Sequence, residues 1–246
     1  MSSNVDRFGI QKIFPDKPGG TTLFGDGPNW FEKYSKHGYE SIKNVKIFRK
    51  TFGFRPKINL GPNLEATIYV FIPRLNPEYG SHPKIGKCSS GSGLSIKLRG
   101  GTHSNSSKKS AKCYVFHFEY EGGDCNNFQK EYPHPKYQKK SIKEENKFPN
   151  WVGRIMGFKA ITINNSDSVD CFAYFDPDTL ITNTFNEIIP KNGWKLRYHV
   201  RDKGQLFNGR CKKPFFDNNG KYIEFRMDNV PKDTLAFAAS LREIVI

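Results

Sequence analysis

Apolar and polar residues alternate with a period of two along much of the chain beyond residue 60. The alternation is clearest in residues 64–72, 94–99, 113–120, 195–202 and 221–229. Because successive side chains of a β-strand point to opposite faces of a sheet, each segment predicts a half-buried strand. Clusters of glycine and proline separate these segments, and no long amphipathic helix pattern occurs. Many short strands in one chain predict an all-β fold, a jelly-roll β-sandwich.

The first 55 residues follow a different pattern. They are rich in glycine, proline and lysine and poor in periodic apolar positions. We therefore expect residues 1–55 to form an irregular N-terminal arm or lid that packs on the sandwich. Residues 56–246 are expected to form the jelly-roll β-sandwich domain.

The chain is strongly basic. Its 246 residues include 39 Lys and Arg against 24 Asp and Glu, a formal charge of +15, and residues 1–150 carry most of the excess. The 21 phenylalanines exclude a disordered polycation. The charge predicts a polyanionic partner. Nucleic acid is disfavoured because no nucleic-acid-binding motif is found, and no apolar run is long enough to span a membrane.

The five cysteines lack any CxxC pair, which disfavours a structural zinc site. If residues 94–99 and 113–120 form an antiparallel hairpin, Cys88 and Cys125 face each other across its base. We therefore expect a disulfide there. Phosphate-binding loops and the zinc-protease and serine-hydrolase motifs are also missing, which disfavours those chemistries.

Several blocks resemble a known group of proteins. They include FGIQKIFPDKPGG near the start, then KCYVFHFEYEG, NWVGRIMGFKAITIN, VDCFAYFD and the closing SLREIVI. Together they resemble a group found chiefly in ammonia-oxidising archaea and described as concanavalin A-like or polysaccharide-lyase-like. LSIKLRGG and GFKAITIN are similar, more weakly, to strands of the jelly-roll lyases that cleave alginate and glucuronan. The Arg-x-Glu-Leu and Gln-Ile-His strands of the largest alginate lyase family are missing here.

The lyase likeness implies a site for β-elimination at a uronate. Such a site needs a group that neutralises the carboxylate, a base and an acid. The candidate proton-transfer residues are His134, Tyr137, His117 and His103, and the candidate substrate-binding residues are Arg99, Lys97, Lys130, Tyr132 and Arg197. The alternative for each is an ordinary role, as a solvated loop residue or a satisfied sheet residue.

Three aspartates lie at the ends of predicted strands. Asp176, Asp178 and Asp228 could supply carboxylates to a structural Ca²⁺, as in jelly-roll sugar-binding domains. Asp-Pro and Asp-Asn are also common turn formers, which is the alternative interpretation. No cofactor is required by any interpretation of the sequence.

These patterns predict a carbohydrate-active protein that engages an acidic, uronate-containing polysaccharide, either cleaving it by β-elimination or only binding it. The alternative is a non-catalytic glycan-binding module or a surface or structural module. Cysteines able to form disulfides and a glycan-type fold favour an extracellular or cell-surface location, although the N-terminus has no apolar segment typical of a signal peptide. The oligomeric state is not predicted.

Overall fold

The structure is a computed structural model of the whole chain. It describes residues 5–6, 8–14, 22–24, 31–34, 45–47, 51–56, 61–74, 93–100, 112–119, 127–133, 136–181, 188–216, 222–228, 230–231, 234–244 and 246. Among these residues, no helix is long and apolar enough to cross a lipid bilayer.

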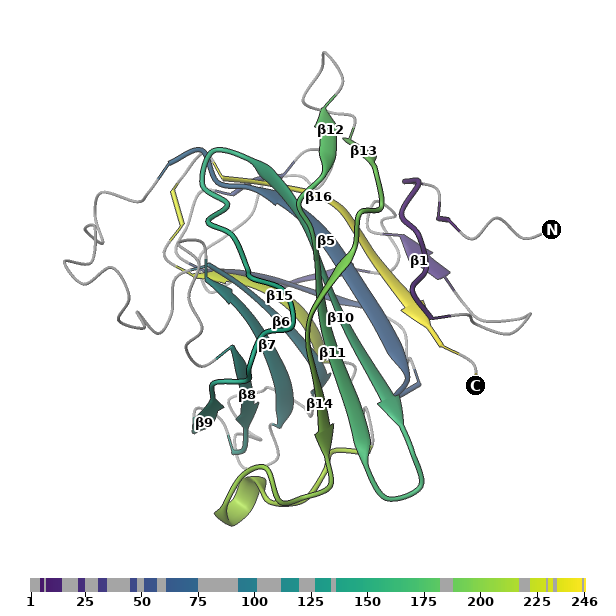
Figure 1. Cartoon of the computed structure of the whole chain (residues 1–246). Coiled ribbons are helices and arrows are strands. Elements are labelled where there is room, and N and C mark those ends of the chain that lie inside the picture. The colour runs from purple at the N-terminus through teal and green to yellow at the C-terminus, as the bar shows by residue number, and fades with distance from the viewer. Residues whose placement is uncertain are drawn as a thin grey trace.

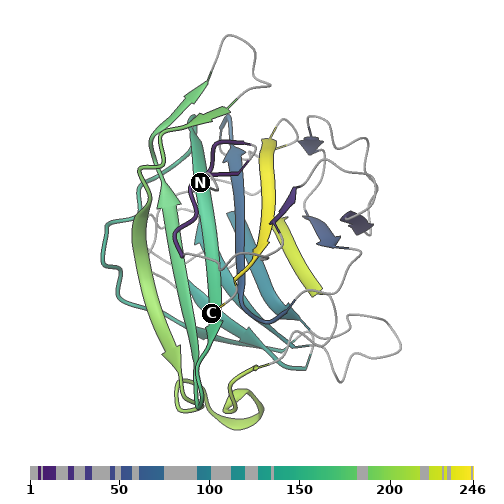
Figure 2. The same ribbon diagram turned by 90° about the vertical axis from the view of Figure 1, so that its right-hand side faces the viewer.

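Two antiparallel sheets pack face to face (Figures 1 and 2). Sheet I has the order β1 (Thr22–Phe24), β16 (Thr234–Glu243), β5 (Leu64–Phe71), β10 (Ile155–Asn164), β11 (Val169–Asp176) and β14 (Lys195–Asp202), and β3 (Val45–Ile47) also pairs with β16. Sheet II has the order β2 (Phe31–Tyr34), β4 (Thr51–Pro56), β15 (Tyr222–Asp228), β6 (Gly93–Gly100), β7 (Cys113–Glu119), β8 (Phe128–Glu131) and β9 (Tyr137–Lys140). The predicted all-β sandwich is confirmed.

Two small elements lie outside the sheets. Strands β12 (Thr179–Ile181) and β13 (Ile188–Pro190) pair as a separate ribbon. A 3₁₀ turn, η2 (Gly209–Cys211), lies between β14 and β15.

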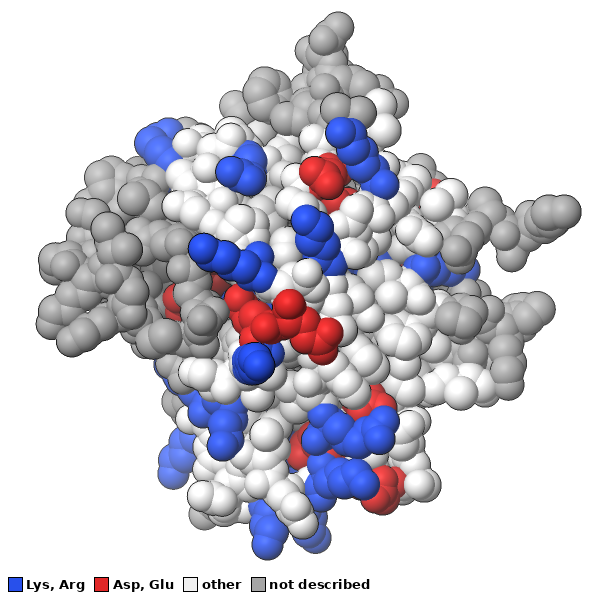
Figure 3. All heavy atoms as spheres, in the orientation of Figure 1, with Lys and Arg blue, Asp and Glu red and all other residues white. Residues whose placement is uncertain are grey.

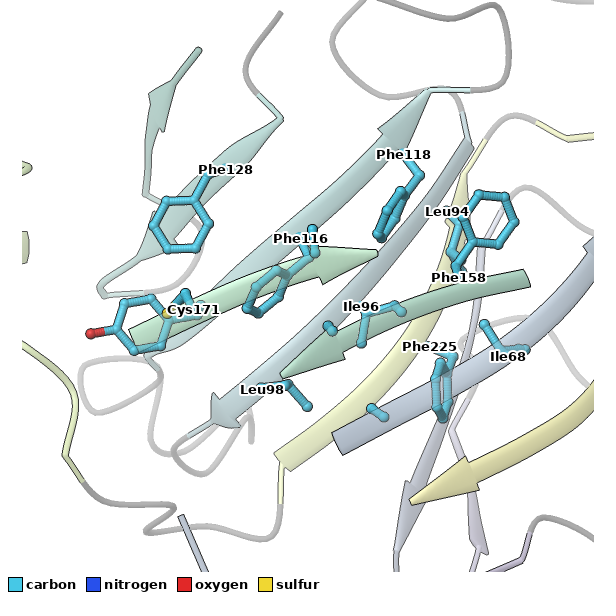
Figure 4. Packing of buried hydrophobic residues seen from close by; sticks show 14 of the residues in the cluster. Ile68, Leu94, Ile96, Leu98, Phe116, Phe118, Phe128, Phe158, Cys171 and Phe225 are labelled. Atoms are coloured by element: carbon cyan, nitrogen blue, oxygen red, sulfur yellow. The ribbon is translucent and has the colours of Figure 1, made fainter. Parts of the chain in front are cut away.

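The core lies between the sheets, where the predicted alternation places the apolar side chains. Figure 4 shows Phe118 of β7 beside Phe158 of β10 within this core. The rings of Phe118 and Phe158 are 5.0 Å apart, a tilted arrangement typical of aromatic pairs. The burial of this apolar area is the main favourable contribution to folding.

The described residues of the expected N-terminal arm include four strands, and the division into residues 1–55 and 56–246 stays a prediction. β1 and β3 join sheet I, and β2 and β4 join sheet II. A separate stretch, residues 5–6 and 8–14, lies on the outer face of sheet I, where Ile10 is buried against Tyr69 and Ile155. We call this stretch the N-terminal segment.

Two irregularities in strand pairing turn side chains away from the face that simple alternation assigns. Arg99 of β6 has a positive φ of 58°, next to a register shift between β6 and β15. In sheet I, a register shift between β11 and β14 leaves Arg197 without a paired residue on β11. Extra residues of this kind re-aim side chains, so both arginines enter the interior of the protein.

Candidate functional site

The outer face of sheet II carries polar side chains from five adjacent strands. The register places Glu224 beside Lys97, and Ser95 beside His117. It also places Glu131 between Cys113 and Tyr137. With strands about 4.8 Å apart, this polar face extends roughly 19 Å across the sheet.

Lys97 is the centre of this face. Its ammonium lies 3.2 Å from Glu224 Oε2 and 3.5 Å from Glu131 Oε2. It also donates to the Tyr137 hydroxyl at 3.4 Å. The Lys97 side chain is only 2% exposed, and a buried ammonium needs compensation of this kind. The sheet therefore balances the Lys97 charge with its own carboxylates.

Cys113 lies beside this cluster but is not a prepared nucleophile. Its thiol donates to Glu131 Oε2 at 3.2 Å. Burial and the charge of Glu131 raise the pKa of the Cys113 thiol well above its usual range. Because the thiolate is the reactive form, this thiol stays protonated and inert in the fold.

His117 is held neutral on the same face. Its Nδ1 shares a hydrogen bond of 2.9 Å with Ser95 Oγ, and its Nε2 lies 3.7 Å from Glu119 Oε1. Burial, followed by the charges of Arg197, Lys139 and Arg226, lowers the pKa of His117 to about 3. Such a histidine is a weak base, and we therefore assign it a hydrogen-bonding role.

One ring nitrogen of His117 has no hydrogen-bond partner among the described residues. This atom is Nε2, in a residue that is 3% exposed. Buried polar atoms are nearly always paired, so an unpaired one needs an explanation. A neutral imidazole nitrogen can donate to, or accept from, a ligand hydroxyl.

Tyr137 lies at the β9 border of the face and is half-buried. Burial raises the pKa of Tyr137 above its ordinary value, while the neighbouring Lys97 opposes that shift. The phenol therefore stays protonated and offers a hydroxyl beside Lys97.

Exposed lysines line the same border. The described exposed lysines in or next to β9 are Lys136, Lys139 and Lys140. Lys143 and Lys147 are exposed in the stretch that follows, together with Glu145. Figure 3 shows Lys and Arg side chains scattered over one face of the molecule, with Asp and Glu gathered in fewer places. This border supplies positive charge that the buried part of the site does not.

Three of the predicted residues lie on this face: Lys97, His117 and Tyr137. Lys97 and Tyr137 are in contact, whereas His117 lies beside Ser95 and Glu119. His134 and His103 lie outside the described residues, as do Cys88 and Cys125 and hence the expected disulfide. The cysteines that the structure describes as free are Cys113, Cys171 and Cys211, all buried.

Arg99 and Lys130 lie inside the sandwich, away from the outer face. Arg99 donates to the carbonyl of Phe215 at 2.9 Å and to the Asn164 side chain. Lys130 donates to Asp202 Oδ2 at 2.6 Å and lies 4.4 Å from the centre of the Phe215 ring.

Tyr132 packs against the same interior network. Its ring lies 6.3 Å from that of Phe215. The Tyr114 hydroxyl completes the network by donating to Asp202 Oδ2 at 2.6 Å. These contacts give Lys130 and Tyr132 structural partners at one end of the core.

Arg197 is also committed to internal contacts. It donates to the His117 carbonyl at 2.8 Å and to Glu144, and its guanidinium lies 4.1 Å from the centre of the Phe148 ring. Its neighbours on β14 remain outside, since Lys195, His199 and Arg201 are exposed. Arg197 therefore supports the backbone at His117. Unlike Lys195, His199 and Arg201, it does not face solvent.

The predicted metal ligands are placed as follows. Asp176 accepts hydrogen bonds from the Tyr69 hydroxyl at 2.8 Å and from the Asp178 amide at 3.1 Å. The side chain of Asp228 lies outside the described residues, although its backbone ends β15. In the described part of the chain, no three His, Cys, Asp or Glu side chains gather as a metal site would require. The Ca²⁺ site stays a prediction.

Sequence reasoning missed Glu131, Glu224 and Ser95 as members of the site. Alternation alone gives a signal for Glu224, which lies opposite the apolar Ile223 and Phe225 of its strand. Placing Glu131 against Lys97 also requires the strand register, which a single sequence does not supply.

Comparison with solved structures finds several sandwich proteins. The acidic lectin of winged bean, complexed with methyl-α-D-galactose, is 7% identical with a TM-score of 0.44, covering 91% of this chain and 98% of that one. The carbohydrate-binding module CBM66 from Bacillus subtilis is 12% identical with a TM-score of 0.35, covering 94% and 98%. Peanut lectin with a nine-residue peptide is 7% identical with a TM-score of 0.39, covering 92% and 99%.

No protein-family model and no curated protein sequence matches the chain. The archaeal group and the alginate and glucuronan lyases therefore stay resemblances. At identities of 12% or less, what each solved protein binds remains a statement about that protein alone.

Proposed function

We propose that this protein is a glycan-binding β-sandwich module whose ligand is an acidic polysaccharide. The observation that carries the proposal is the polar outer face of sheet II, which bears Lys97, His117 and Tyr137 on three strands and brings Lys97 into contact with Tyr137. Sheet faces that pack only against protein are usually apolar, whereas binding sites place a few polar groups in fixed positions.

The chemistry of the face suits hydroxyl-rich ligands. His117 offers an uncharged ring nitrogen, and Tyr137 offers a protonated hydroxyl. The Lys97 charge is already balanced by Glu131 and Glu224. The buried part of the site therefore supplies hydrogen bonds, and a polymer reaches it from the β9 border.

The exposed lysines of that border favour an acidic polymer. Lys139 and Lys140 are the last two residues of β9, the strand that begins at Tyr137. A row of exposed cations attracts a polyanion over a distance set by salt screening. We therefore expect binding to weaken as ionic strength rises.

A binding assay on the whole chain tests this proposal. We expect a glucuronan or alginate oligomer to bind, and a neutral glucan oligomer of equal length to bind at least tenfold more weakly. Tyr137→Phe, which keeps the ring and removes the hydroxyl, should weaken acidic-oligomer binding. Equal affinity for the neutral oligomer, or stronger binding to DNA than to any glycan, would contradict the proposal.

Cleavage of the same polymer by β-elimination is the second candidate. It is favoured by the placement of the Tyr137 hydroxyl, a proton donor, within 3.4 Å of the Lys97 ammonium. Incubation with uronate polymers would reveal cleavage through the ultraviolet absorbance of an unsaturated product. Retained binding without that product would leave the protein a binding module.

A further inference from the structure

A second polar cluster lies on the opposite side of the sandwich, beneath the N-terminal segment. On the outer face of sheet I, Thr67 of β5 pairs with Lys159 of β10 on one side and with Ser240 of β16 on the other. Glu65 pairs with Arg242 in the adjacent row. Three strands therefore bring five polar side chains together in two rows.

The sheet supplies more positive than negative charge to this cluster. Arg242 Nη1 lies 2.6 Å from Glu65 Oε1, and Lys159 Nζ lies 3.0 Å from the same oxygen. One carboxylate of the sheet thus serves two buried cations. The second carboxylate comes from the N-terminal segment, where Asp6 Oδ2 lies 2.6 Å from Arg242 Nη2.

Three polar atoms in this cluster have no hydrogen-bond partner among the described residues. They are Thr67 Oγ1, Ser240 Oγ and Arg242 Nε, and each belongs to a side chain no more than 2% exposed. Each of these groups can donate a hydrogen bond. Their gathering at one place indicates an unfilled capacity to bind an acceptor.

The backbone beside the cluster is irregular. The pairing of β16 with β5 shifts register between Phe237 and Ser240, and Ala238 has a positive φ of 46°. Residues other than glycine rarely adopt a positive φ. Bulges and such strained residues are concentrated near functional sites.

Asp6 contacts Arg242 from a turn that its own side chain stabilises, and its carboxylate binds the guanidinium as the carboxylate of a ligand would. Its Oδ1 accepts from the amides of Phe8 and Ile10, at 2.8 and 3.0 Å, which leaves Oδ2 for the guanidinium. The carbonyl of Gln11 accepts from Lys159 at 2.6 Å. The Ile10 carbonyl accepts from Arg242 Nη2 at 2.9 Å, so the segment presents a carboxylate and two carbonyls to the two cations.

We propose that this face of sheet I is a second binding site, for the carboxylate of a uronic acid residue, and that Asp6 occupies it here. The choice of a uronic acid rests on the function proposed above. For one carboxylate and its neighbouring hydroxyls the site has two cations, Arg242 and Lys159, and the two hydroxyls of Thr67 and Ser240. Displacing the N-terminal segment opens it.

An aromatic ring beside the cations suits a sugar. The Lys159 ammonium lies 4.4 Å from the centre of the half-buried Trp194 ring. The Trp194 ring in turn meets Tyr69 edge-on, at 5.9 Å. A ring in this position can pack on the apolar face of a pyranose whose carboxylate lies at Arg242.

The carboxylate site is tested first without any sugar. In the full chain carrying Asp6→Asn, the N-terminal segment no longer has the negative charge that pairs with Arg242. A synthetic peptide of residues 4–14 with Asp6 should bind this variant at least tenfold more tightly than the same peptide with asparagine there, by calorimetry. Adding Arg242→Gln should abolish the difference. Equal binding of the two peptides, or no binding of either, overturns the proposal.

The ligand class is tested with the wild-type chain. A glucuronan oligomer should accelerate hydrogen exchange at the amides of Phe8 and Ile10, and a neutral glucan oligomer should not. Asp6→Asn should tighten glucuronan binding about tenfold. Asp167→Asn, which alters an exposed carboxylate paired with Lys203, is the matched control and should change nothing.

The two proposals fail in different ways. If the peptide with Asp6 binds but no uronate oligomer does, the carboxylate site stands and the acidic-glycan function fails. If uronate oligomers bind without accelerating hydrogen exchange at the segment amides, and Asp6→Asn leaves their affinity unchanged, the acidic-glycan function stands. The site proposed on sheet I is then refuted.

Discussion

The two outer faces of the sandwich each bury a lysine among carboxylates, but they neutralise it in different ways. On sheet II, Lys97 meets Glu131 and Glu224, both from strands of its own sheet. On sheet I, Lys159 and Arg242 share Glu65, and the remaining carboxylate, Asp6, comes from the N-terminal segment. Charge balance is therefore intrinsic to sheet II, whereas on sheet I it depends on a segment distant in sequence.

We expect the largest difference between the two faces in the stability lost when one carboxylate is removed from each. Glu65→Gln leaves two buried cations with too little compensation and should lower the free energy of unfolding by about 3–5 kcal/mol. Glu224→Gln leaves Lys97 beside Glu131 and should lower it by about 1–2 kcal/mol. Chemical denaturation of both variants measures the contrast. Equal losses would mean that the two faces are compensated alike.

Acid should weaken the fold through His117. Its folded pKa of about 3 lies below the unfolded value of 6.5, so the unfolded state binds the extra proton as pH falls. This histidine should therefore remove about 2.5 kcal/mol of stability between pH 6 and pH 4. Comparing denaturation of wild type and His117→Gln over that range isolates the effect from titrating carboxylates. Parallel curves would show that His117 titrates normally.

Alkali should strengthen the fold through Lys159. Burial, partly offset by Glu65, lowers the pKa of Lys159 to about 8, so the folded state releases its proton before the unfolded state does. Stability should accordingly rise by about 1.5 kcal/mol between pH 8.5 and pH 10. Lys159→Met should lack this increment in matched thermal or chemical unfolding. An equal increment in the variant would assign it to other groups.

The smallest effect on stability is expected at the β9 border. Lys139→Gln combined with Lys140→Gln should change the free energy of unfolding by less than about 0.5 kcal/mol, because both side chains are exposed. The same change should weaken binding of an acidic oligomer severalfold at low salt, with little effect at high salt. Lys203→Gln, an exposed lysine elsewhere, serves as control. Identical salt dependence in all three proteins would remove the border from the binding site.

Alternation predicted the strands and the core well, because burial of one sheet face imposes a period of two on the sequence. It failed at Arg99 and Arg197, where irregular pairing turns a polar side chain inward. Nothing in the local sequence marks these positions, since each looks like one more outward residue of its strand.

The sequence also could not predict the parts of both candidate sites that depend on contacts between residues distant in the chain. Asp6 and Arg242 are 236 positions apart, and no periodic pattern links the N-terminal segment to the last strand. Lys97 was identified as a candidate, but its partner Glu131 follows only from the register of β6, β7 and β8. Such contacts are set by tertiary packing and register, not by propensity.

Two buried free thiols can serve as built-in probes of local opening of the fold. Cys113 and Cys171 are completely buried, one on the outer face of sheet II and the other between the sheets, and burial raises the pKa of both. Alkylating reagents act on exposed thiolates, so each thiol can react only when its own surroundings separate. The order in which the two become labelled would therefore report whether the polar face or the core of the sandwich opens first.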